Sequence, residues 1–221
     1  MNEVSKLINT HKTEINENNF TKVYEDAYNL VDDASSIGKL TEIFLAAGLE
    51  PLVYMQEVPD YYLCLSDISS VTIPNTVTSI GMNAFYDCKK LTSITIPDSV
   101  TSIHANAFNW CTGLKSVTIP NSVTSIGSSA FMYCTGLTNI KISDSITSIN
   151  AATFFDCERL TSVTIPASVT SIGKSAFRGC SELKITFNGT KAQWDTIKKE
   201  SKWKYAKSKF TIHCTDGDLK E

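Results

Sequence analysis

Seven cysteines and three histidines are the side chains of this sequence best suited to catalysis or metal binding. A thiol beside an imidazole can act as a nucleophile, and four such side chains can hold zinc. The spacing favours neither arrangement. There is no Cys-x-x-Cys pair and no Cys/His cluster at zinc spacing, and the neighbours His213 and Cys214 would point to opposite faces of a strand.

Acidic side chains and glycines give no stronger signal for chemistry. Asp216 and Asp218 flank a glycine near the end of the sequence, but calcium usually takes six to eight oxygen ligands. The sequence contains no phosphate-binding glycine loop. We therefore expect no catalytic residue, no cofactor and no metal site, and we expect that the chain is not an enzyme.

Five of the cysteines recur with a fixed period of 23 residues, and five phenylalanines share that period. The two columns are Cys88, Cys111, Cys134, Cys157 and Cys180, and Phe85, Phe108, Phe131, Phe154 and Phe177. A constant period of this length is typical of stacked repeat units. Each unit would bury its Phe and Cys against the next, so we expect the five thiols to be reduced core residues rather than disulfides or metal ligands.

One unit, Leu91 to Leu114, shows how the chain would fold in each repeat. Its start, from Leu91 to Ile96, has the alternating β-branched pattern of a strand, and the segment from Val100 to Ile103 predicts a second extended piece. The segment from Ala107 to Cys111 predicts a helical turn that carries Phe108 into the core. The position after the second extended piece holds Gly81, His104, Gly127, Asn150 and Gly173, which predicts a left-handed turn there. We thus interpret His104 as a turn residue, not a ligand or base.

Residues 68–184 closely resemble the BspA-type leucine-rich repeat, also seen in treponemal surface proteins. The resemblance rests on the repeated Leu-x-x-Ile-x-Ile-Pro strand, the Ala-Phe pair and the Cys that follows it. It implies a mainly β repeat solenoid with short helical turns. It also implies a binding protein, often a bacterial surface adhesin, and it names no catalytic residue. The absence of a signal sequence departs from the adhesin pattern.

The flanks of the repeats predict a cap at each end. Residues 1–57 have a helical pattern and would form an N-terminal helical cap, or else a docking or oligomerisation region. Residues 58–184 would form the solenoid, with one degenerate half-repeat and about five full repeats. Residues 185–221 would form a small α/β C-terminal cap, in which Thr190 and Gln193 make a capping box that opens a short helix.

Charge is distributed unevenly although the net charge is only −3. Residues 1–60 carry 4 Lys and 11 acidic residues, whereas residues 185–221 carry 8 Lys and 5 acidic residues. This pattern makes nucleic acid an unexpected partner. No apolar run reaches the length of a membrane span and the start lacks a secretory signal, so the sequence predicts a cytoplasmic or virion location unless a signal was removed.

Two exposed surfaces are candidates for binding a partner. One is a face of small polar strand residues, for which the alternative is that such residues simply suit a tight sheet. The other is an aromatic stripe beside the core Phe, for which the alternative is partial burial in the turns. The candidate residues are Thr72, Thr95, Thr118, Lys141 and Thr164 for the face, and Tyr86, Trp110, Met132, Tyr133 and Phe155 for the stripe.

The sequence thus favours a non-enzymatic protein-interaction module, adhesin-like, that binds a protein through the solenoid surface. The alternative is a structural or assembly component, for example one associated with a phage or virion, in which residues 1–57 drive oligomerisation.

Overall fold

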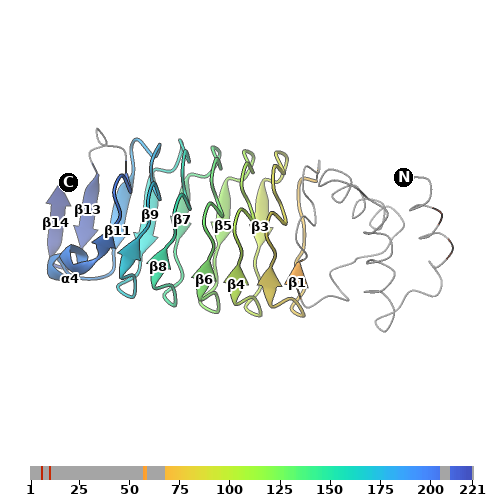
Figure 1. Cartoon of the computed structure of the whole chain (residues 1–221), viewed down its shortest axis with the longest axis horizontal. Coiled ribbons are helices and arrows are strands. Elements are labelled where there is room, and N and C mark those ends of the chain that lie inside the picture. Colours follow the sequence, from red (N-terminus) through yellow and green to blue (C-terminus); the bar gives the residue numbers. More distant parts are fainter. Residues whose placement is uncertain (1–5, 7–9, 11–56, 59–67, 205–209, 221) are drawn as a thin grey trace.

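A computed structural model describes Lys6, Thr10 and residues 57–58, 68–204 and 210–220. The helical N-terminal region that the sequence predicts lies almost entirely outside these residues. The described chain winds into a β-solenoid of about six coils, stacked along one axis with the C-terminal cap at one end (Figure 1).

Each coil contributes two short strands, and strands from successive coils pair in parallel. The seven-stranded sheet has the order β14-β13-β11-β9-β7-β5-β3, and the other two sheets have the orders β1-β2-β4-β6 and β12-β10-β8. The strands of the long sheet are β3 (Ser93–Thr95), β5 (Ser116–Thr118), β7 (Asn139–Lys141), β9 (Ser162–Ile165), β11 (Lys184–Phe187), β13 (Thr211–Cys214) and β14 (Gly217–Lys220). The short strands of the other sheets are β1 (Glu57–Val58), β2 (Ser79–Ile80), β4 (Ser102–Ile103), β6 (Ser125–Ile126), β8 (Ser148–Ile149), β10 (Ser171–Ile172) and β12 (Lys198–Lys199).

The core follows directly from the repeat. The five repeating phenylalanines are fully buried and stack ring on ring, with centroids 5.1 to 5.7 Å apart and ring planes within 13° of parallel. The repeating cysteines and the strand Ile and Val residues surround this stack. A period of 23 residues therefore stacks each core side chain on the equivalent side chain of the next coil, as the sequence predicts.

The segment that carries each Phe differs from the helical turn that we expected. It forms consecutive tight turns, in which the amide of Asn109 donates to the carbonyl of Asn106 and the amide of Cys111 donates to that of Phe108. Left-handed residues at two repeat positions interrupt any helix: Asn83, Asn106, Ser129, Ala152 and Ser175 form one set, and Asp87, Trp110, Tyr133, Asp156 and Gly179 form the other.

The left-handed turn predicted at Gly81, His104, Gly127, Asn150 and Gly173 is wrong, since none of them has positive φ. The left-handed residues come two and six positions later. Close packing explains glycine better, because a Cβ on Gly127 would clash with the backbone nitrogen of Ala105 in the preceding coil. His104 remains exposed in a turn segment.

One junction between coils lacks part of the regular backbone ladder. β6 and β8 belong to different sheets, and β5 pairs with β7 only through Thr118 and Lys141. Side chains replace the missing bonds: the Nδ2 of Asn150 donates to the carbonyl of Ile126 (2.6 Å), and the hydroxyl of Ser143 donates to that of Val123 (2.9 Å). Polar side chains thus join these two coils where the backbone does not.

The short helix that the sequence predicts in the C-terminal segment is present. The capping box at Thr190 and Gln193 opens α4 (Lys191–Thr196), and the carboxylate of Asp216 accepts a hydrogen bond from the Lys191 amide (2.8 Å). Trp194 and Trp203 are buried, and Trp203 closes the phenylalanine stack by meeting Phe177 edge to face at 6.3 Å. β14 then adds an antiparallel strand at the end of the long sheet.

Candidate binding surface

The cysteine column is built for packing rather than nucleophilic attack. Each Sγ from Cys111 onwards donates to a phenylalanine carbonyl of the preceding coil, at 3.0 to 3.2 Å. Burial raises the pKa of the Cys134 thiol well above its ordinary value, and it raises the pKa of Cys180 to about 12. A thiolate is the reactive form, so these side chains stay neutral and inert near neutral pH.

No group of three metal-ligating side chains occurs within the part of the chain that the structure describes. The two acidic residues near the end serve local contacts instead: Asp216 caps α4, and Asp218 pairs with the Nδ1 of His213 across β13 and β14 at 2.8 Å. Cys214, next to His213, is only partly buried, and burial is the main cause of its raised pKa.

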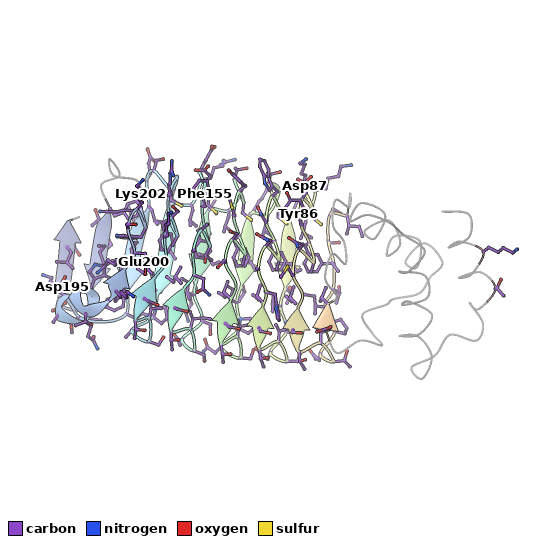
Figure 2. All side chains as sticks on the ribbon, in the orientation of Figure 1. Tyr86, Asp87, Phe155, Asp195, Glu200 and Lys202 are labelled. Atoms are coloured by element: carbon purple, nitrogen blue, oxygen red, sulfur yellow. The ribbon has the colours of Figure 1, made fainter. Side chains whose placement is uncertain are left out.

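Aromatic side chains from three successive coils form a second stack outside the core. Trp110 and Tyr133 lie 4.3 Å apart between ring centroids with their planes tilted by 32°, and Tyr133 meets Phe155 edge to face at 5.6 Å. The guanidinium of Arg178 lies over the Phe155 ring at 5.6 Å. We call Trp110, Tyr133, Phe155 and Arg178 the aromatic ridge. Tyr86, Asp87 and Phe155 lie along one edge of the solenoid in Figure 2.

A regular backbone ladder holds this edge in place. The amide of Trp110 donates to the carbonyl of Met132 at 2.9 Å, and the amide of Tyr133 donates to that of Phe155 at 2.8 Å. Equivalent bonds from Asp87 and Asp156 extend the ladder on either side. The stripe predicted from sequence is therefore two adjacent columns: Tyr86, Met132 and Phe155 lie in one, and Trp110 and Tyr133 in the other. Tyr86 makes no ring contact with the ridge.

Backbone strain distinguishes Trp110 and Tyr133 from their equivalents in other coils. Their φ angles are +64° and +57°, a left-handed conformation that costs roughly 1–2 kcal/mol for most L-residues. Other coils place Asp87, Asp156 and Gly179 at this position, and Asp and Gly tolerate it better. Sequence analysis missed the strain, although the Asp and Gly at the equivalent positions were a usable signal.

Burial accounts for only part of this choice of residues. Trp110 is 38% exposed, and within the described residues it and Met82 are the exposed large hydrophobics. Tyr133 and Phe155 are half-buried. A stacked aromatic pair contributes about 0.5–1.5 kcal/mol, which offsets the strain of one residue at most. Strained backbone in a well-supported structure is often found at functional sites.

Charges lie at the ends of the ridge rather than at its centre. Two and three residues after Trp110 and Tyr133, Thr112, Gly113, Thr135 and Gly136 are small and uncharged. In the coil before, the ammonium of Lys89 pairs with Asp87 at 3.1 Å. In the coil after, burial and the nearby Glu158 raise the pKa of Asp156, while Arg178 opposes the shift. The result is an apolar centre with a charged margin at each end.

The polar strand face is the other candidate surface. Thr72, Thr95, Thr118 and Lys141 are exposed and Thr164 is half-buried, and adjacent members pair in register along the long sheet. This face is therefore continuous and lies on a different part of each coil from the aromatic ridge.

Comparison with known proteins places these surfaces on a familiar repeat. The BspA type leucine-rich-repeat region family matches residues 56–184 in six copies. A leucine-rich-repeat protein of T. pallidum is 31% identical with a TM-score of 0.56, over 59% of this chain and 65% of that one. One from Bacteroides ovatus is 25% identical with a TM-score of 0.53, over 69% of this chain and 44% of that one.

A third leucine-rich-repeat protein, from Eubacterium ventriosum, is 28% identical with a TM-score of 0.52, over 54% of this chain and 32% of that one. The chain thus spans less than two thirds of each of these relatives. No functionally curated protein shows significant similarity. Among the described residues, no helix has both the length and the apolar character needed to cross a bilayer. The repeat sequence, the solenoid and the family match agree, and the chain belongs to the BspA-type leucine-rich-repeat family.

Proposed function

We propose that this chain is a non-enzymatic interaction module that binds a protein through the aromatic ridge. The observation that carries the proposal is the partial exposure of Trp110, which is 38% exposed, on a left-handed backbone. Members of this family are associated with protein interaction or surface-protein roles, which supports the general class. The ridge supplies the specific surface.

The composition of the ridge suits a binding centre. Trp, Tyr and Arg are the residues most enriched at energetic hot spots of protein interfaces, and hot spots usually have a less critical margin around them. Trp110 and Tyr133 would form the apolar centre, and the Asp87–Lys89 pair would form part of the margin. The backbone ladder beneath the rings limits the conformational entropy lost on binding.

Binding studies can test the proposal with a matched control. The full-length chain is immobilised to capture partners, and each captured protein is titrated by calorimetry against wild type, W110A/Y133A and M82A. Loss of the aromatic pair should raise Kd at least about tenfold, because hot-spot truncations typically cost about 2 kcal/mol or more. M82A removes a comparably exposed apolar side chain away from the ridge and should leave Kd unchanged.

Two results would count against the ridge. Equal affinity of W110A/Y133A and wild type for every captured partner would remove it as the binding site. An equal loss in M82A would indicate non-specific apolar contact instead. An adhesin-like role and an assembly role both require a partner of this kind, and its identity, a host-surface protein or an assembly subunit, would separate them.

A further inference from the structure

The outer face of the long sheet has an unusual charge pattern. Strands β3, β5, β7, β9 and β11 contain no Asp or Glu. Their outward side chains are hydroxyls, one amide and two ammonium groups: Ser93, Thr95, Ser116, Thr118, Asn139, Lys141, Ser162, Thr164, Lys184 and Thr186. The nearest acids along the chain are Glu182, two residues before Lys184, and Asp98 and Asp144, in the turns that follow β3 and β7. We call these ten residues the hydroxyl–lysine face.

Lys141 and Lys184 give this face a positive charge. Both are exposed, and neither has an ion-pair partner among the described residues. One strand, β9, separates them, and Lys184 is in register with Asn139, two residues before Lys141, so their backbones lie roughly 12 Å apart. Hydroxyl groups around two unneutralised ammonium groups can donate several hydrogen bonds to carboxylates. The face therefore fits an anionic chain that runs across the strands.

The same polypeptide contains a matching anionic segment. Residues 1–60 carry 11 acidic residues and 4 lysines, a net charge of −7, whereas the whole chain has a net charge of only −3. The hydroxyl–lysine face and the acidic segment are both present in every copy, so complementary attraction between copies requires no further component.

We propose that the hydroxyl–lysine face binds the acidic N-terminal region of a second copy of this chain. Reciprocal exchange between two copies would close a two-fold dimer, since each copy offers both halves of the contact. The contact depends on exposed charges, so it is weak and is screened by salt. It does not involve the aromatic ridge, which stays free for a different partner.

Sedimentation velocity of the full-length chain over a range of concentrations tests the proposal. We expect concentration-dependent association at about 0.05 M salt that weakens strongly at about 0.5 M, where the screening length is far shorter. The variant K141E/K184E should weaken association about tenfold, from the loss of two exposed pairs and the repulsion that replaces them. Neutralisation of the other side in E14Q/E17Q/D32N/D33N should have the same effect.

A matched control separates this contact from net charge alone. Lys174 is exposed in a turn outside the long sheet, so K174E changes the charge without touching the face and should associate as wild type does. Thermal melts confirm that each variant is folded. A monomer at all concentrations would overturn the proposal. The single variant K141E is measured beside K174E, because both change the charge by the same amount. Equal weakening of association by K141E and K174E would also overturn the proposal, and so would association that is insensitive to salt.

Discussion

Two aromatic stacks run along this solenoid, one inside and one outside. The inner stack uses Phe in five successive coils, with near-parallel rings and no exposure. The outer stack occupies three coils, uses Trp110, Tyr133 and Phe155, and varies from a tilt of 32° to an edge contact of 78°. The same stacking of coils supports both. The conserved positions of the repeat determine which side chains form the core. The variable positions of the repeat determine which side chains lie on the outer surface, and so distinguish one coil from another.

The contrast also separates stability from recognition. A buried ring in a uniform column contributes fully to folding, whereas a partly exposed ring on a strained backbone contributes less net stability. Removal of a single ring should therefore lower the free energy of unfolding much more in the inner stack than in the outer stack.

Removal of the central core ring should be the most damaging change. Phe131 is fully buried and stacks on both Phe108 and Phe154. Phe131→Ala should reduce the free energy of unfolding by about 3–5 kcal/mol, through lost burial and the cavity left behind. Urea denaturation measures this loss. Comparable destabilisation in W110A would show that the two stacks do not differ in the way described.

Alkaline pH should weaken the core through the thiols. The pKa of Cys180 is raised from 9.0 to about 12 in the folded chain, chiefly by burial. Because the pKa of the thiol is higher in the folded chain than in the unfolded chain, its contribution to the stability of the folded state is complete at pH values below the unfolded pKa. That contribution is lost as the pH rises from about 9 towards 12. By pH 10.5 the loss from this thiol should be about 2 kcal/mol. Urea midpoints for wild type and Cys180→Ala across this range measure the difference, and parallel curves for the two proteins would refute this origin.

At the interrupted junction between the coils of β6 and β8, a side-chain hydrogen bond should contribute the stability that a backbone hydrogen bond contributes at the other junctions. The Nδ2 of Asn150 donates to the Ile126 carbonyl, where His104, Gly127 and Gly173 use their amides for the equivalent bond. Asn150→Ala should cost about 1 kcal/mol, the usual net value of one hydrogen bond. Asn139→Ala, which loses only an exposed contact to Thr138, is the control and should change stability less.

The outer stack should tolerate replacement by a residue that suits its backbone. Trp110→Asn removes the ring contact with Tyr133 but relieves the left-handed strain, and these effects are of similar size. Because part of the Trp110 ring is buried, the free energy of unfolding of this variant should still fall, but by less than the loss of about 3–5 kcal/mol expected for Phe131→Ala. A large loss in urea denaturation would assign Trp110 to folding.

Sequence alone was sufficient for the buried columns of the repeat. The period predicted the buried Phe and Cys columns, and the box at Thr190 and Gln193 predicted the start of α4. Backbone dihedrals were harder, because the glycine at positions such as Gly127 reflects close packing between coils rather than left-handed geometry. That contact depends on how coils stack, which no single repeat reveals.

The candidate surface was predictable only in outline. The aromatic residues could be identified because they occupy positions of the repeat where the residue type changes from coil to coil. Their division into two columns, the strain at Trp110 and Tyr133, and the approach of Arg178 to Phe155 depend on the three-dimensional path of the turns. The helical region predicted for residues 1–57 lies almost wholly outside the described residues and remains a prediction.

The most direct test of the outer stack is the affinity of Trp110→Asn for a captured partner, measured by calorimetry on the folded variant. A binding role predicts Kd at least about tenfold above that of wild type, because a hot-spot ring is missing while the scaffold is intact. A Kd equal to that of wild type would contradict it and would leave the exposed tryptophan without a role in recognition.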